Sequence, residues 1–185
     1  MRAVAVLVAL LVGPGATPAV AADAQVHFDR AREAFTRGLY QQALAEYDAV
    51  LELTGEDAAV RHNKALVYLA MKDSARAADE ARRAVDLAPR EGRYRITQAV
   101  AMLSMDPADW KGAEGALHAA EKLLKRVRDH VGLASAYDNL GFIAQHARDY
   151  PAARRWYTLA LRHNPDDEKA REALDALGRQ GPTMD

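Results

Sequence analysis

The stretch of sequence that decides the fold is residues 134–167, ASAYDNLGFIAQHARDYPAARRWYTLALRHNPDD. Its apolar residues recur at spacings of three and four, which is typical of amphipathic helices. Arg148 and Asp149 interrupt this pattern, and Pro151 follows where the first turn of a helix does not need an N–H group. The stretch therefore predicts two helices of about 13 residues that are joined by a short turn.

The same layout recurs along the chain. Ala43 and Ala77 are 34 positions apart, and Ala113 and Ala153 hold the same place in two further copies. A tyrosine or tryptophan stands three positions before this alanine in three of the four copies. No stretch alternates apolar and polar residues as a strand does. The sequence therefore predicts an all-α fold, an α-solenoid of about four helix-turn-helix repeats.

On these residues the sequence resembles the tetratricopeptide repeat (TPR) family. The copy at 134–167 matches the family's pattern at Tyr137, Leu140, Gly141, Tyr150, Ala153, Tyr157, Ala160, Leu161 and Pro165. Residues 24–57 and 58–91 are two further copies. Residues 92–127 form a divergent copy, whose second helix we expect to extend to about residue 130. We expect residues 168–178 to cap the array, because its last apolar face needs a cover, and residues 179–185 to form a tail after Gly178 stops the helix.

Close packing explains the small residues in this pattern, since a larger side chain would hold two touching helices apart. We assign this structural role, together with the filling of the space between hairpins, to the following residues: Ala43, Ala77, Ala113, Gly141, Ala153 and Tyr157.

The first 22 residues have a different character. Arg2 is their only charge, residues 3–12 are an unbroken apolar run, and Gly13-Pro14-Gly15 ends any helix before Ala19-Val20-Ala21. This order is typical of a secretory signal peptide, and the run is half of the roughly 20 residues that a spanning helix needs. We predict cleavage near residues 21–24, no integral membrane span, and, because the chain has no cysteine for a lipid anchor, a periplasmic or secreted product.

Composition and motifs argue against other classes. The chain has 25 basic and 26 acidic residues, so its net charge of −1 does not attract nucleic acid, and zero cysteines exclude disulfides and thiolate–metal sites. Metalloprotease, phosphate-loop and nucleophile-elbow motifs are absent. Glu114, His118 and Glu121 share a helix face and could hold a metal. The alternative interpretation is that they form an ordinary polar helix face in contact with solvent. We predict no enzyme, no catalytic residue, no metal and no cofactor.

In the TPR family the first helices of successive hairpins line a concave groove that holds a peptide or a partner's helix. Carried over position by position, the resemblance places these residues in the groove: Phe28, Arg32, Phe35, His62, Leu66, Leu69, Arg93, Ile96, Val100, Leu103, Phe142 and His146. The family's carboxylate-clamp members have lysine and asparagine where this chain has Phe28 and Arg32. A chaperone's acidic C-terminus is therefore not the expected partner.

The resulting hypothesis is an exported interaction module that binds a segment of a cell-envelope or secreted protein in its groove. Two alternatives remain open: an array that self-associates as a structural scaffold of an envelope complex, and an enzyme or metal carrier. Each groove residue also has an alternative interpretation, which is packing in the core between hairpins.

Overall fold

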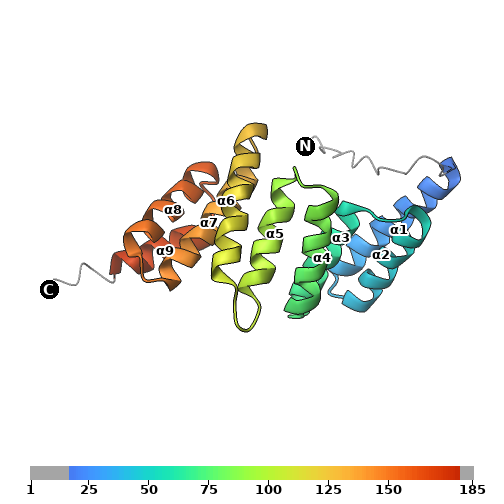
Figure 1. Cartoon of the computed structure of the whole chain (residues 1–185), viewed down its shortest axis with the longest axis horizontal. Coiled ribbons are helices and arrows are strands. Elements are labelled where there is room, and N and C mark those ends of the chain that lie inside the picture. The colour runs from blue at the N-terminus through green and yellow to red at the C-terminus, as the bar shows by residue number, and fades with distance from the viewer. Residues whose placement is uncertain (1–16, 180–185) are drawn as a thin grey trace.

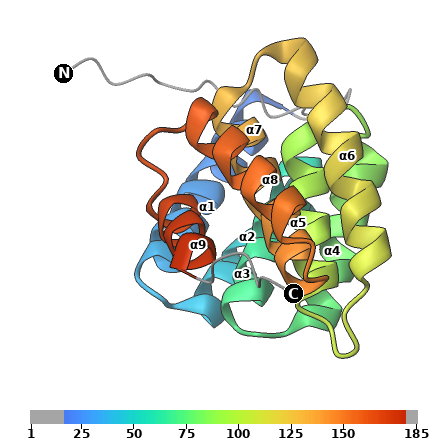
Figure 2. The same cartoon turned by 90° about the vertical axis from the view of Figure 1, so that its left-hand side faces the viewer.

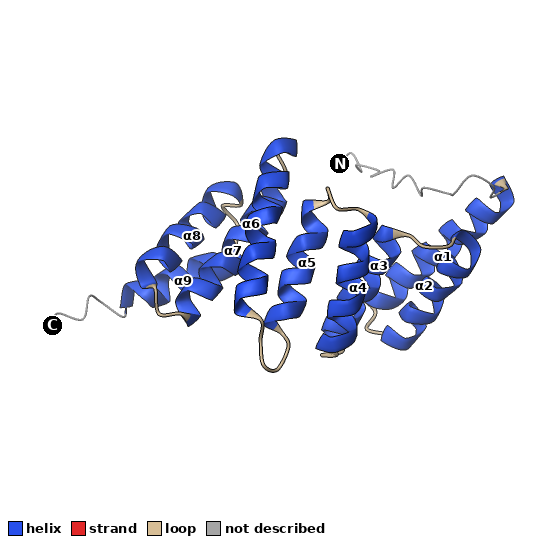
Figure 3. Cartoon of the chain, in the orientation of Figure 1, coloured by secondary structure: helices blue, strands red, loops and turns tan. Residues whose placement is uncertain are grey.

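The computed structural model of the chain describes residues 17–179, and this part consists of helices and turns without a strand (Figures 1 and 3). Its helices are α1 (Pro18–Thr36), α2 (Tyr40–Thr54), α3 (Ala58–Ala70), α4 (Ser74–Leu87), α5 (Gly92–Leu103), α6 (Trp110–Val127), α7 (His130–His146), α8 (Tyr150–His163) and α9 (Glu168–Arg179). The all-α prediction is confirmed. Residues 1–16, which hold most of the predicted signal peptide, lie outside the described part.

The helices pair as antiparallel hairpins, α1 with α2, α3 with α4, α5 with α6 and α7 with α8. The four hairpins follow one another along the long axis, and α9 packs against α8 at the end of the array (Figure 1). Seen along this axis, the helices are distributed around it and do not lie in one flat layer (Figure 2). This is the arrangement of an α-solenoid.

Aspartate residues fix where most of these helices begin. The carboxylates of Asp57, Asp73, Asp109, Asp129 and Asp149 each accept a hydrogen bond from the backbone N–H three residues later. Each cap satisfies one of the N–H groups that the first turn of a helix leaves free, and is worth about 1 kcal/mol.

The turns inside the hairpins use a left-handed residue. Gly38, Lys72 and Arg148 have φ values of 73°, 61° and 62° at the equivalent position of three hairpins. Glycine adopts this conformation without the steric cost that lysine and arginine incur. The turn geometry is therefore kept by the repeat even where the favoured residue is missing.

Small residues lie at the closest helix contacts. Ala43, Ala77, Ala113 and Ala153 are completely buried. A Cβ atom added at Gly141 would lie 2.6 Å from the Tyr157 ring, so the backbone of α7 touches the face of α8 at this point. Close approach of the two helices thus requires these residue types.

The core consists of two hydrophobic clusters. The N-terminal cluster joins α1, α2 and α3 and includes Phe28, Tyr47 and Val67. The C-terminal cluster runs from α5 to α9 and includes Leu117 and Leu140. The α3–α4 hairpin also buries the charged side chains of Arg61, Lys64 and Glu80. The core is thus distributed along the array, as expected for a repeat protein.

Two predicted boundaries are wrong. The second helix of the third hairpin does not extend to residue 130: α6 ends at Val127, because Arg128 adopts a left-handed conformation that lets the N–H of Asp129 bond to the carbonyl of Leu124. Gly178 does not stop α9 either, and Arg179 belongs to this helix. Gly178 has no left-handed φ, which is the conformation that would end a helix.

Candidate partner-binding groove

The first helices α3, α5 and α7 lie side by side and share one face of the array, which we call the groove face. A hollow of about 240 Å³ lies on it, and its walls come from all three helices. The lining residues are His62, Arg93, Ile96, Thr97, Val131, Gly132 and Ser135. A second hollow of about 470 Å³ lies between α7 and the start of α9, with Asp138, Asp166 and Asp167 in its wall. The groove face is therefore concave at these two places.

Two of the predicted groove residues belong to the core. Phe28 is only 5% exposed, and its ring meets the Tyr47 ring edge to face with the centroids 5.8 Å apart. Ile96 is 8% exposed and packs in the C-terminal cluster. Burial inside the array leaves the Phe28 side chain little free surface for a partner, whereas Ile96 still contributes to the wall of the hollow between α3, α5 and α7.

The other predicted residues keep some contact with solvent. Those that are half-buried are Phe35, His62, Leu66, Leu69, Val100 and Leu103, and those that are exposed are Arg32, Arg93, Phe142 and His146. Phe142 is 49% exposed, the largest fraction among the apolar members of this set. Phe35, Val100 and Leu103 also pack against the hydrophobic clusters.

Three aromatic side chains gather where α7 passes the start of α6. The Trp110 ring stacks on the His146 ring at 3.7 Å between centroids and 14° between planes, and lies 5.9 Å from the Phe142 ring. We call these three residues the aromatic cluster. The resemblance to the TPR family places Phe142 and His146 in the groove but not Trp110. No local signal could have found this residue, because the contact joins two hairpins.

Arg93, a charged residue of the groove face, is paired with Asp129. The guanidinium of Arg93 donates to both carboxylate oxygens of Asp129, at 2.5 Å and 2.9 Å. This hydrogen bonding lowers the pKa of Asp129 and raises that of Arg93. Arg93 therefore ties α5 to the start of α7, and its charge is compensated before any partner arrives.

His62 is a neutral residue of the groove face. Its ring stacks on Tyr94 at 4.6 Å between centroids, and its buried Nδ1 atom has no hydrogen-bond partner within residues 17–179. Burial, helped by the positive charge of Arg93, lowers the pKa of His62 to about 4. At neutral pH the ring is therefore an uncharged, half-buried part of the groove wall.

The metal alternative rests on Glu114, His118 and Glu121, and in the structure Glu121 is already engaged. Its carboxylate lies 3.3 Å from His118, and it accepts hydrogen bonds from Lys125 and Tyr137. No group of three metal-ligating side chains gathers in the described residues. None of the described helices combines the length and the apolar character that crossing a membrane requires.

Comparisons with known proteins agree with this architecture. Residues 58–91 and residues 134–167 each match a sequence profile described as a tetratricopeptide repeat. A search of curated proteins finds no match.

Three solved structures share the fold at low sequence identity. PilF of Pseudomonas aeruginosa superposes with a TM-score of 0.77 and 16% identity, over 88% of this chain and 70% of that one. A protein of Thermus thermophilus, TTC0263, described as a thermophilic TPR protein, gives 0.72 and 18%, over 85% and 82%. YrrB, described as a TPR protein with an unusual peptide-binding site, gives 0.66 and 16%, over 84% and 76%. The chain therefore contains two segments that match the tetratricopeptide repeat, at residues 58–91 and 134–167, within a fold that it shares with TPR proteins.

Proposed function

We propose that this protein is a non-catalytic interaction module, which binds a peptide or helix of a partner protein on its groove face. The observation that carries the proposal is the aromatic cluster, in which Phe142 stays half in solvent beside Trp110 and His146. Interfaces take most of their binding energy from a few such aromatic anchors.

The half-buried apolar residues of neighbouring helices extend this surface. Val100 and Leu103 continue it along α5, and Leu66 and Leu69 along α3. One stripe across three first helices fits an extended or helical segment better than a small molecule. The fold shared with YrrB, whose description names a peptide-binding site, supports the same proposal.

We further propose that the partner is a cell-envelope or secreted protein. The support is the signal-like order of residues 1–22 together with a chain free of cysteine. Sequencing the N-terminus of protein purified from the native envelope fraction tests export. A mature chain that begins between residues 21 and 25 would agree with it, and one that begins at Met1 would contradict it.

Affinity capture from the same fraction tests the groove. The unchanged protein and two variants serve as bait: Phe142→Glu on the groove face, and Val127→Glu as a control at a residue that is 67% exposed at the end of α6. We expect Phe142→Glu to weaken capture by about 30-fold, as the loss of a binding hot spot does, while Val127→Glu retains it.

Both variants should keep the melting temperature of the parent, because both side chains are exposed. Equal capture by Phe142→Glu and the parent would contradict the groove proposal. Light scattering distinguishes the alternative, since a self-associating scaffold would have at least twice the monomer mass, and Phe142→Glu would not change that mass.

A further inference from the structure

Two histidines meet at the open end of the fourth hairpin. His130 is the first residue of α7 and His163 the last residue of α8, so the antiparallel pairing brings them together at the end that no turn closes. Their Nδ1 atoms are 2.9 Å apart. The proposed groove does not use this contact.

The rings face each other through their nitrogens. Their centroids are 5.1 Å apart with 29° between the planes. The distance between the two centroids is close to the sum of the Nδ1–Nδ1 distance and the two ring radii. Both Nδ1 atoms therefore lie almost on the line between the centroids. A zinc ion on this line, about 2.0–2.1 Å from each nitrogen, would need them about 4 Å apart. The geometry therefore fits a shared proton, in an N–H···N hydrogen bond, and not a metal chelate.

Such a bond depends on the number of protons that the two rings hold. One Nδ1 must donate and the other must accept through its lone pair. The bond exists when both rings are neutral, and also when one is an imidazolium that donates to a neutral partner. When a second proton is added to the neutral pair, both rings become imidazolium ions. The accepting lone pair is then lost, and two cations lie against each other.

The surroundings oppose this second proton. Burial, then the charges of His130 and Lys125 of α6, lower the pKa of His163. The Tyr137 ring of α7 lies 5.6 Å from the His163 ring, and Glu121 of α6 is already paired with Lys125.

Three other charged groups are near by. Asp129, the chain neighbour of His130, is already paired with Arg93 of α5. Arg162 of α8 precedes His163 and Arg128 stands two residues before His130, so both add positive charge.

We propose that His130 and His163 form a proton-sensitive clasp, which holds the first turn of α7 to the last turn of α8 near neutral pH and opens in acid. Since the folded state resists the second proton, the stability that the clasp contributes is complete above the ordinary histidine pKa of about 6.5. It is lost as the pH falls from there through the lower folded-state pKa.

The clasp stands next to the groove face. Val131 and Gly132, in the same turn of α7 as His130, line the hollow between α3, α5 and α7. Opening the clasp removes the tie between this turn and α8, while Asp129 still caps the turn and Arg93 still ties it to α5.

NMR titration of the histidine rings tests the shared proton. In the parent protein we expect one of the two rings to take up a proton near pH 6.5 and the other at clearly lower pH. In His163→Leu, which installs the residue that Leu53 and Leu87 supply at the equivalent place of two other repeats, the step at lower pH should be absent. Two independent titrations near pH 6.5 in the parent would overturn the proposal.

Amide hydrogen exchange at pH 7 and pH 5, corrected for intrinsic rates, tests the opening. Acid should raise opening of the first turn of α7 and the last turn of α8 by about 2- to 12-fold, the range expected for one hydrogen bond. In His163→Leu, and in His130→Ala, the opening should be equal at both pH values.

His27→Gln is the control, because His27 lies in α1, outside this hairpin and outside the aromatic cluster, and the variant should keep the parent's response to acid in α7 and α8. A response that survives in His163→Leu and His130→Ala would show that another group is responsible.

Discussion

At the scale of single residues, the fold depends on contacts that tolerate no additional atom. Gly141 is the clearest case, because three atoms of the Tyr157 ring lie within 2.9 Å of the place where its Cβ would be. Tyr157 cannot easily move away, since it is 3% exposed and its hydroxyl donates to Gln145. Gly115 of α6 is the contrasting glycine, with open space at its Cβ position.

We expect Gly141→Ala to destabilise the protein by about 1–2 kcal/mol. Overpacking costs about 1–3 kcal/mol, and the better helix propensity of alanine returns part of this. Gly115→Ala should instead stabilise it by up to about 1 kcal/mol, because only the propensity changes. Urea unfolding of both variants measures the two effects. Equal stabilisation by both would show that α7 and α8 are not in close contact at Gly141.

Burial of single residues was the least predictable property. The positional pattern places Phe28 and Phe142 in the same groove, yet one is 5% exposed and the other 49%. The difference comes from neighbours far along the chain: Tyr47 covers Phe28, whereas the aromatic cluster leaves Phe142 at the surface. A repeat pattern says which face of a helix a residue occupies, and it does not say what covers that face.

At the scale of helices and turns, the sequence predicts most of the architecture, because a turn needs only local signals. Asp73 and Asp149 stand where an N-cap is needed, and apolar residues at helical spacing follow both. The end of α6 could not be predicted, because no local signal marks it. Residues 122–128 contain no glycine or proline, and the left-handed Arg128 that ends the helix has no local signal.

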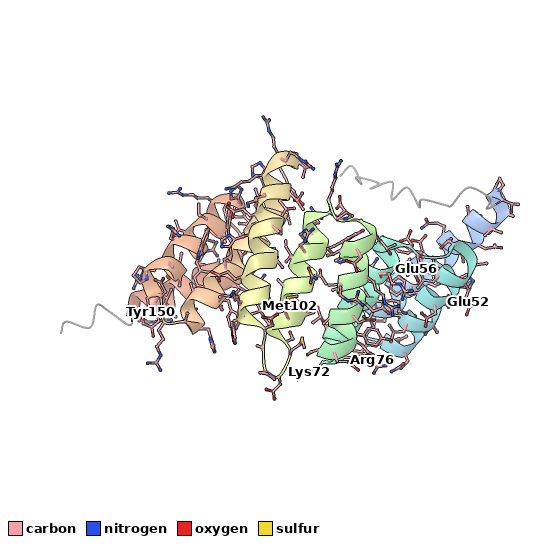
Figure 4. All side chains as sticks on the ribbon, in the orientation of Figure 1. Glu52, Glu56, Lys72, Arg76, Met102 and Tyr150 are labelled. Carbon is pink, nitrogen blue, oxygen red and sulfur yellow. The ribbon has the colours of Figure 1, made fainter. Side chains whose placement is uncertain are left out.

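Packing between helices also holds a charged network that the sequence pattern does not reveal. Glu80 of α4 accepts from Arg61 of α3 at 3.0 Å and 3.2 Å, and lies 3.2 Å from Lys64. Lys64 also donates to Asp48 of α2 at 2.6 Å, and Arg61 to Glu56. Figure 4 labels Glu56 at the connection between α2 and α3. The network therefore joins three helices.

The pKa values agree with strong pairing. The hydrogen bond to Glu56 raises the pKa of Arg61 despite burial. Burial would lower the pKa of Lys64, but Asp48 and Glu80 raise it above its usual value. Both cations thus remain charged in the interior, and each depends on its carboxylate partners.

We expect Glu80→Gln to destabilise the protein by about 2–3 kcal/mol. The change leaves Arg61 and Lys64 buried with one acidic partner fewer each, and hydrogen bonds to charged groups are worth about 1.5–3 kcal/mol. Glu56→Gln is the matched control, because the Glu56 side chain is 56% exposed and its ion pair is screened, so the loss should stay below about 1 kcal/mol. Chemical denaturation measures both. A loss from Glu80→Gln no larger than that from Glu56→Gln would show that the network contributes little.

At the scale of the whole molecule, the array is held unevenly. Interior hairpins pack on neighbours at both sides, whereas a terminal hairpin has a single neighbour. The C-terminal end is covered by α9, which buries Ala170 and Leu177 in the C-terminal cluster. In residues 17–179 no helix covers the outer side of α1, and α2 meets α3 through the sparsest of the contacts between successive hairpins.

We therefore expect the array to open from its N-terminal hairpin. Native-state hydrogen exchange should give the amides of α1 and α2 an opening free energy at least about 1 kcal/mol below that of α5 to α8, because the loss of one hairpin breaks a single interface. Leu177→Ala is the control at the other end. It removes a buried side chain that is 1% exposed, so it should lower protection in α8 and α9, by about 2–5 kcal/mol, and leave α1 and α2 unchanged. If every amide from α1 to α8 exchanges with one free energy, and Leu177→Ala lowers all of them equally, the molecule unfolds as a single unit and the uneven packing has no energetic consequence.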